Sequence, residues 1–331
     1  MSARNHLIPG NFRKFLLIYN PGSGQGKYRQ YLDKTARFFH DAGLTLDIVP
    51  TESRGHATEL AREGCAGDYD VIIGAGGDGT INEVLNGMAG SGKTLAILPW
   101  GTGNVFAAEM NIPSDPVRAC RVIADSYHAR LDLARIGERY FLLMCGAGFD
   151  AYSIKHAEQM NIKRAVGRLG YVLASIKAFP RYRFSEIEVE MDGGIRDKGT
   201  FVLVSNTSRY GTFFTISPRA VPNDGLLDVY VFKEAGGRWN FIKLVTQMIL
   251  TAFKPRTRSK KIFFKKQAYY RAKSVRLCSD YEVPTQIDGE LFQPLPAVIK
   301  AVPSAIDVIL PKRVARRYGR QRVTVNPNRR D

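Results

Sequence analysis

The 331-residue sequence contains no long hydrophobic run. No apolar stretch approaches the roughly 20 residues that a membrane-spanning helix needs, and the first residues, MSARNHLIPGNFRK, lack the apolar core of a secretory signal. The four cysteines form no C-x-x-C pair and have no histidine at metal-ligand spacing, which argues against a disulfide framework or a zinc site. We therefore expect a cytoplasmic protein with reduced thiols.

Acidic residues are missing from two C-terminal segments. The formal charge is +17, but Ala235–Ser279 holds twelve Lys and Arg residues, Lys312–Arg330 holds eight, and neither contains Asp or Glu. Without these twenty, 28 of the 48 basic residues remain against 31 acidic ones, so the rest of the chain is nearly neutral. Such basic blocks suit a polyanionic surface, either nucleic acid or an anionic membrane leaflet.

The central feature is the stretch Val71–Gly87, VIIGAGGDGTINEVLNG. The β-branched run that opens it predicts a buried strand over Val71–Ile73, which we expect Gly74 to end. A helix should follow, with Thr80 as its N-cap and Glu83 at capping-box spacing. A glycine turn between a strand end and a helix N-terminus presents free N–H groups to a ligand. The stretch therefore predicts a phosphate cradle.

Two generic motifs overlap this stretch, and neither fits its surroundings. Gly74, Gly76 and Gly79 match the dinucleotide pattern G-x-G-x-x-G, but the next predicted strand, Leu95–Leu98, is not followed by the acidic residue that the pattern requires. Gly87–Thr94, GMAGSGKT, matches the P-loop letters. It lies between a helix and a strand, however, which is the reverse of the P-loop context. We reject both.

The first part of the chain alternates strands with helices, which predicts an α/β fold with a doubly wound parallel sheet. Strands are expected at Lys14–Tyr19, Thr45–Val49, Val71–Ile73 and Leu95–Leu98. Ligands of such sheets bind at the carboxyl ends of the strands. That edge should gather four polar or glycine-rich segments: Asn20–Lys27, Thr51, Gly74–Thr80 and Pro99–Asn104.

From about Leu131 the strands follow one another with fewer helices between them, starting with a hairpin around Gly137 and Glu138. This pattern predicts a β-rich, mostly antiparallel second domain. We expect a first domain over residues 12–130, a second domain over 131–296, a final strand at 297–311 and a basic tail at 312–331.

These segments together resemble the diacylglycerol kinase catalytic-domain and sphingosine kinase superfamily, with the bacterial YegS-like branch as the nearest pattern. Glycine–aspartate loops alone are shared with NAD kinases and phosphofructokinases, but here a full set occurs in the family's order over about Lys14–Pro311. The matching motifs are Asn20–Gly24, Gly76–Thr80 with Asn82 and Glu83, Pro99 with Gly101–Asn104, Gly148–Asp150, Asp224–Asp228 and Asp288–Glu290. The resemblance implies a lipid kinase that uses ATP and Mg²⁺. It also implies that the first domain binds ATP, that the second binds the lipid, and that the final strand packs back on the first domain.

Carried over by position, the resemblance implies an ATP site made of backbone amides and neutral side chains. Its residues would be Asn20, Pro21, Gly22, Ser23, Gly24, Thr51, Gly76, Gly77, Asp78, Gly79, Thr80, Ile81, Asn82, Glu83, Thr102 and Asn104. Lys27 is a candidate cation for the phosphates, although a surface lysine at a helix start is an equally good interpretation.

The resemblance also implies a structural Mg²⁺, held by the side chain of Asp224 and the backbone carbonyls of Val221 and Leu226. Oxygen ligands suit such a hard cation. A plain turn at Asp224 and Gly225 is the alternative. Asp150 matches a residue that contacts the substrate headgroup in sphingosine kinases.

Phosphoryl transfer needs a base or orienting carboxylate beside the acceptor hydroxyl. The bacterial branch implies Asp288 or Glu290 as the base, and the sphingosine kinase branch implies Asp78. We favour the Asp288–Glu290 element as the base and Asp78 as the organiser of Mg²⁺ and ATP, with the other assignment left open.

Two positions depart from the family pattern. Val105 stands where the third loop often has an aspartate, and Tyr210–Phe214 carries two phenylalanines where the family often has glycines. Both departures bear on the acceptor lipid more than on the kinase assignment.

The predicted function is transfer of the γ-phosphoryl group of ATP to a hydroxyl of a diacylglycerol-like or sphingoid-like lipid. The basic, aromatic segment Lys254–Arg276, with the basic tail, would hold the protein at the inner face of the membrane. The alternatives are a soluble NAD kinase-like enzyme and a nucleic-acid-binding protein, although we expect no nucleic acid partner. A homodimer is left open.

Overall fold

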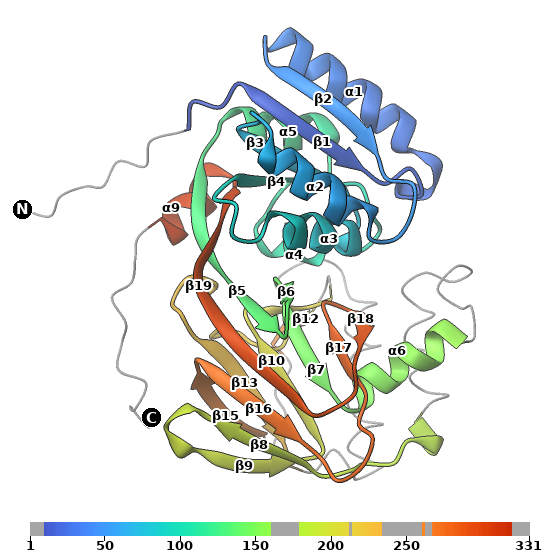
Figure 1. The fold of residues 1–331 in the computed structure, drawn as a ribbon, viewed down its shortest axis with the longest axis vertical. Coiled ribbons are helices and arrows are strands. Elements are labelled where there is room, and N and C mark those ends of the chain that lie inside the picture. Colours follow the sequence, from blue (N-terminus) through green and yellow to red (C-terminus); the bar gives the residue numbers. More distant parts are fainter. Residues whose placement is uncertain (1–9, 160–178, 212–213, 234–259, 262–266, 320–331) are drawn as a thin grey trace, which may run out of the picture.

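The computed structural model describes residues 10–159, 179–211, 214–233, 260–261 and 267–319. Two lobes lie one above the other in Figure 1, and the long strands β5 and β19 run between them. The upper lobe is α/β and the lower one is mostly β, as the sequence predicts.

The upper lobe is built on a parallel sheet. Its strands β1 (Lys14–Tyr19), β2 (Thr45–Pro50), β3 (Val71–Gly76) and β4 (Thr94–Pro99) pair in the order β2-β1-β3-β4. Successive side chains of β1 face opposite sides, because strands alternate. Phe15 packs edge-on against Phe39 of α1 (Tyr28–Asp41), while Leu16 lies against Gly64 of α2 (His56–Ala66). Helices therefore cover both faces of this sheet (Figure 1).

The predicted boundary between β3 and α3 was wrong at both ends. β3 continues through Gly74 to Gly76, and α3 (Asp78–Met88) has Gly77, not Thr80, as its N-cap. The glycines stay in the strand because β1 and β4 pair with it on both sides. A Cβ on Gly74 would lie 3.1 Å from Ile81, and one on Gly76 would lie 2.7 Å from Thr80. Their bare backbone lets α3 begin directly over the strand end.

The lower lobe contains a six-stranded, largely antiparallel sheet in the order β15-β13-β10-β7-β17-β18. Its buried side chains form a second core with Ile187, Val189 and Val275 from the opposing strands. The bounds are β7 (Met144–Ala147), β10 (Phe201–Ser205), β13 (Leu227–Phe232), β15 (Gln267–Ala272), β17 (Thr285–Ile287) and β18 (Glu290–Phe292).

The first sheet also extends into the lower lobe through β19 (Ala297–Ile309). This strand pairs in parallel with β4 through Asp307 and Val308, and along most of its length with β5 (His128–Ile136) in antiparallel register. The sheet then continues through β16 (Ser274–Cys278), β8 (Ile187–Met191) and β9 (Arg196–Gly199), while β6 (Arg139–Phe141) pairs with β5 at its margin. The predicted hairpin around Gly137 is therefore confirmed.

Shorter elements complete the described fold. They are the helices α4 (Val105–Glu109), α5 (Pro116–Ala124), α6 (Phe149–Gln159) and α9 (Lys312–Tyr318), the 3-10 turns Gly24–Gly26, Phe179–Arg181 and Asp192–Gly194, and the two-residue strands β11 (Arg209–Tyr210), β12 (Phe214–Thr215) and β14 (Lys260–Lys261).

The segment from residue 312 begins as a helix and not as a tail. Val314, Ala315 and Tyr318 of α9 are buried, and the Tyr318 carbonyl accepts a hydrogen bond from Asn223 Nδ2 at 2.6 Å. The helix forms because these three apolar side chains have a surface on which to pack. Residues 320–331 lie outside the described part of the chain.

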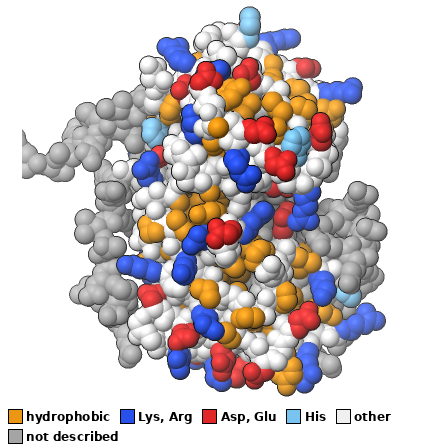
Figure 2. All heavy atoms as spheres, viewed as in Figure 1, with side chains coloured by type: hydrophobic (Ala, Val, Ile, Leu, Met, Phe, Trp, Pro, Cys, Tyr) orange, Lys and Arg blue, Asp and Glu red, His pale blue; other side chains and the backbone are white. Residues whose placement is uncertain are grey.

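The predicted membrane-docking surface falls largely outside the described residues. Of Lys254–Arg276, only residues 260–261 and 267–276 are described. On the face shown in Figure 2, basic and acidic side chains are interspersed over both lobes. Within the described part of the chain, no helix is long and apolar enough to cross a membrane.

Candidate functional site

Three loops meet at the carboxyl edge of the parallel sheet. Asn20, directly after β1, donates from its backbone N–H to Ala75 O at 3.1 Å and from Nδ2 to Thr80 Oγ1 at 3.4 Å. Its Oδ1 accepts the N–H of Gly22 at 2.8 Å, which fixes the turn of the loop that follows β1. The N–H of Thr51 donates to Tyr19 O at 2.8 Å, fixing the loop after β2 beside the first.

A hollow of about 800 Å³ opens between these loops, within the size range of small-molecule sites. It lies at the N-terminus of α3, where backbone N–H groups and the helix dipole favour an anion. Its lining consists of Asn20, Pro21, Gly22, Ser23, Thr51, Glu52, Ser53, Arg54, Gly77, Gly79, Thr80, Glu83 and Glu290. Nine of the sixteen residues predicted to bind ATP are in this lining, and so is Glu290, one of the predicted catalytic residues.

The other predicted ATP residues support the loops or pack behind them. Ile81 is buried in the core, and the Nδ2 group of Asn104 donates to Pro99 O at 3.0 Å and Gly101 O at 2.6 Å. The Gly101 N–H donates to Gly76 O at 2.9 Å, which joins the loop after β4 to the glycine turn after β3. The rest of this group is Gly24, Gly76, Asp78, Asn82 and Thr102.

Asp78 faces the loop between β4 and α4 and does not line the hollow. Its Oδ1 accepts the N–H of Phe106 at 3.4 Å, and a Cβ on Gly103 would lie 2.9 Å from its Oδ2. Burial raises the pKa of Asp78, and the backbone N–H groups of Val105, Phe106 and Asn104 partly offset this rise. The side chain is therefore placed to hold the start of α4 against the glycine turn.

Asp288 is the acceptor of four hydrogen bonds. Its carboxylate receives the backbone N–H groups of Leu142 (2.9 Å), Leu143 (2.9 Å) and Met144 (3.0 Å), and Asn82 Nδ2 at 3.0 Å. Burial raises its pKa to about 6, against the lowering effect of these backbone donors. Since Asn82 belongs to α3 and the three amides to the lower lobe, Asp288 ties the two lobes together.

Glu290, two residues later, is in a different position. Asp288 and Gly289 both have positive φ (51° and 87°), which turns the chain sharply between β17 and β18. The turn brings Glu290 to the glycine loop, where a Cβ on Gly79 would lie 2.7 Å from its Oε1. Its side chain is 40% exposed, and Oε2 accepts a hydrogen bond from Arg54 Nη2 at 3.2 Å. Of the three predicted catalytic carboxylates, Glu290 alone lines the hollow.

A hydrogen-bonded path connects this turn to Asp150. Gln286 accepts the N–H of Gly289 on Oε1 at 2.8 Å and donates from Nε2 to Asp150 Oδ2 at 3.0 Å. Asp150 is buried in the first turn of α6, and its Oδ1 accepts the N–H of Ala151 at 2.7 Å. Burial raises the pKa of Asp150 to about 6. Asp150 therefore lies one glutamine away from the turn that holds Glu290.

Asp224 has partners on both carboxylate oxygens. Oδ1 accepts the Leu226 N–H at 3.1 Å, and Oδ2 is paired with the guanidinium of Arg271. Within the described part of the chain, no group of three or more His, Cys, Asp or Glu residues could hold a metal ion. As placed, these residues do not fit a divalent ion at Asp224, because Arg271 already supplies the positive charge. The predicted Mg²⁺ site of Val221, Asp224 and Leu226 stays a prediction without support from this arrangement.

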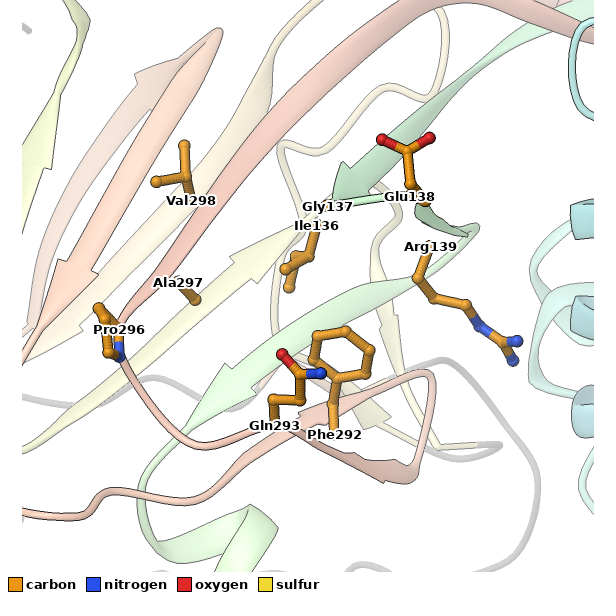
Figure 3. Close-up of a pocket in the computed structure, with 9 residues that line it drawn as sticks. All are labelled: Ile136, Gly137, Glu138, Arg139, Phe292, Gln293, Pro296, Ala297 and Val298. Carbon is orange, nitrogen blue, oxygen red and sulfur yellow. The ribbon is translucent and has the colours of Figure 1, made fainter.

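A second hollow, of about 460 Å³, lies between the β5–β6 hairpin and the chain that runs from the end of β18 to the start of β19. It is lined by Ile136, Gly137, Glu138, Arg139, Phe292, Gln293, Pro296, Ala297 and Val298 (Figure 3). Phe292, Ile136, Pro296, Ala297 and Val298 give it an apolar part, while the Arg139 guanidinium points away from the other labelled side chains. The hollow contains none of the predicted site residues.

The sequence reasoning missed several residues that complete the site. Glu52, Ser53 and Arg54 line the hollow because they directly follow Thr51 on the loop after β2. Their position after a strand end was a usable signal, and it was applied only to Thr51. Gln286 and Tyr140, whose carbonyl accepts a hydrogen bond from Asn86 Nδ2 at 3.0 Å, gave no signal, since their contacts join residues far apart in the chain.

Comparisons with known proteins identify the family to which the sequence is similar. Residues 14–136 match the model of the diacylglycerol kinase catalytic domain, and residues 144–310 match the YegS C-terminal NAD kinase beta sandwich-like domain. A diacylglycerol kinase of Bacillus subtilis strain 168 is 30% identical over 303 residues, covering 90% of this chain and 97% of the relative. One of Staphylococcus haemolyticus is 30% identical and covers 89% and 88%.

The fold is likewise similar to a crystal structure of a diacylglycerol kinase from Bacillus anthracis strain Sterne. The two superpose with a TM-score of 0.70 at 25% identity, over 92% of this chain and 99% of that one.

Proposed function

The chain belongs to the diacylglycerol kinase family and is a lipid kinase, and we propose that it transfers the γ-phosphoryl group of ATP to a hydroxyl of diacylglycerol. The observation that carries the proposal is the position of Glu290, which the β17–β18 turn holds against Gly79 of the glycine loop. A carboxylate from the lower lobe thereby reaches the glycine loop at which the phosphates of ATP would lie.

ATP would bind in the hollow at the carboxyl edge of the parallel sheet. Its phosphates would lie at the N-terminus of α3, where Gly77 and Gly79 leave backbone N–H groups uncovered by side chains. Asn20 and Thr80 would add neutral donors from the two sides of the hollow. Asp78 would act indirectly, by holding the loop after β4 against this turn.

Mg²⁺ would bind in the same hollow, together with the phosphates. Glu52 and Glu83 line it and would offer the oxygen ligands that this ion prefers. When bound, the ion would neutralise part of the triphosphate charge.

The reaction needs one proton acceptor beside the lipid hydroxyl. Glu290 would take the hydroxyl proton while the hydroxyl oxygen forms a bond to the γ-phosphorus and the bridging oxygen leaves with ADP. Asp288 would keep the turn in place, since four donors already occupy its carboxylate. The proposal therefore assigns the base to Glu290, where the sequence left Asp78, Asp288 and Glu290 open.

Diacylglycerol is the first candidate acceptor because the curated relatives are diacylglycerol kinases. A sphingoid base is the second candidate, and the buried carboxylate of Asp150 favours it. An ammonium headgroup would pair with that charge, whereas a neutral glycerol hydroxyl would only need it as a hydrogen-bond acceptor. Association with the inner face of the membrane through the basic segments is part of the proposal, since the acceptor lipid resides there.

The proposal is tested with [γ-³²P]ATP and Mg²⁺ in mixed micelles that contain diacylglycerol, sphingosine or phosphatidylglycerol, with NAD in a separate reaction. We expect label in phosphatidic acid with wild-type protein and its loss with Glu290→Gln. Label in the sphingoid base, lost with Asp150→Asn, would select the second candidate. Label in NADP with none in extractable lipid would overturn the proposal.

A further inference from the structure

The nucleotide hollow is short of positive charge. Three carboxylates line it, those of Glu52, Glu83 and Glu290, and Arg54 is the one Lys or Arg among its lining residues. A triphosphate carries about four negative charges at neutral pH and is commonly bound with help from Lys or Arg side chains. Lys27, the cation suggested by the sequence, is exposed at the start of α1 and does not line the hollow.

Arg54 lies on a short loop whose neighbouring residues are hydrogen-bonded, and its side chain extends into solvent. It lies between Thr51, which is bonded to β1, and Gly55, the N-cap of α2 with φ 88°. The Glu52 N–H donates to His56 Nδ1 at 3.1 Å and closes this loop across Arg54. The loop thus positions the Arg54 Cα at the margin of the hollow, and its 81% exposed side chain can take more than one partner.

The present partner of Arg54 is the proposed base. Nη2 of Arg54 lies 3.2 Å from Glu290 Oε2, and both side chains are substantially exposed. Such an exposed ion pair contributes little to stability, so exchanging it for another anion costs little. The terminal phosphates of ATP are the better partner for a guanidinium, because they carry more negative charge than a single carboxylate and also offer paired oxygens to its planar fork.

We propose that Arg54 binds the terminal phosphates of ATP and, in doing so, releases Glu290 for the acceptor hydroxyl. The proposal rests on the proposed function, since it assigns a phosphate-binding residue to that site. Without nucleotide, Arg54 occupies the Glu290 carboxylate. With nucleotide, the guanidinium turns to the phosphates, and the base becomes available only when the phosphoryl donor is in place.

The test measures equilibrium binding of ATP, ADP and AMP, each with Mg²⁺, to full-length wild type and to Arg54→Met, Arg54→Lys and Arg62→Met. Arg62 is a matched control, because it is an exposed arginine of α2 that does not line the hollow. We expect Arg54→Met to weaken ATP binding about 10- to 30-fold and AMP binding less than 2-fold. Arg54→Lys should restore part of the ATP affinity, and Arg62→Met should match wild type.

A second measurement is the ATP affinity of variants of the proposed base, Glu290. Glu290→Gln should bind ATP about 2-fold more tightly than wild type, because the anion that competes for Arg54 is gone, and this gain should vanish when Arg54→Met is added. Unchanged ATP affinity in Arg54→Met, or equal weakening of ATP and AMP, would overturn the assignment while lipid labelling by wild type would still support the function. Wild-type protein that neither binds ATP nor labels a lipid would overturn both.

Discussion

Replacing Asp288 should damage stability far more than replacing Glu290, although the two residues belong to one motif. Asp288→Ala removes the acceptor of four hydrogen bonds, three of them from consecutive backbone N–H groups. A hydrogen bond to a charged group contributes about 1.5–3 kcal/mol. Asp288 is half-buried, so water can replace part of this set, and we expect a loss of about 3–5 kcal/mol in the free energy of unfolding.

Backbone conformation adds to the cost at this position. Asp288 has φ 51°, a left-handed conformation that Asp and Asn tolerate better than Ala. Asp288→Asn should therefore lose less than Asp288→Ala, since it retains one acceptor oxygen and the backbone preference. Its amide group would still face N–H donors, so it should remain less stable than wild type.

The assay is urea denaturation at pH 7, followed by circular dichroism and tryptophan fluorescence. Glu290→Gln is the control: its side chain is 40% exposed with a single ion pair, so its free energy of unfolding should change by less than about 1 kcal/mol. If Asp288→Ala unfolds within 1 kcal/mol of wild type, the four hydrogen bonds do not join the lobes and the structural role given to Asp288 is wrong.

Three further outcomes follow from the same structure. Asp150→Asn should remove one contribution to the pH dependence of stability between about pH 4 and 6. With its pKa raised to about 6, folded Asp150 keeps a proton that the unfolded chain has lost, so the contribution of Asp150 to stability falls as pH rises through this window. Urea titrations of wild type and mutant at several pH values would show the difference, and a mutant with the wild-type slope would contradict it. Gly79→Ala should displace the flexible end of Glu290 and lower kinase activity at least 10-fold, with little loss of stability. Gly101→Ala should lower the melting temperature, because its Cβ would lie 2.4 Å from Gly77 Cα. Equal stability of the two variants would argue against these contacts. Cys65 and Cys278 should react with a thiol reagent in the native protein. Cys120 and Cys145 should react only after unfolding, because both are buried and burial raises the pKa of both thiols, that of Cys120 to about 11. Rapid labelling of all four cysteines would refute the burial.

The fold class could be predicted from the sequence because its signals are local. Strand β1 has the predicted bounds, Lys14–Tyr19, since its apolar run ends at a proline–glycine turn. The start of α3 could not be placed, because Gly74 and Gly76 read as turn residues by themselves. They remain in the strand only through pairing with β1 and β4, which the local sequence does not encode.

The site was predictable where a residue follows a strand end. Asn20, Thr51 and the glycine loop all meet at one edge, as the parallel arrangement requires. The different roles of Asp288 and Glu290 were not predictable, since they depend on amides about 145 positions away in the chain. The same limit applies to Arg271, whose pairing with Asp224 depends on the register between β13 and β15.

The most direct test of the account is the single-turnover rate of phosphoryl transfer from ATP to diacylglycerol by wild type and Glu290→Gln, measured with ATP saturating. The account predicts a fall of at least 100-fold in the rate with ATP affinity retained, because the base is lost and the phosphate cradle is intact. A Glu290→Gln variant that transfers the phosphoryl group within 3-fold of the wild-type rate would contradict it.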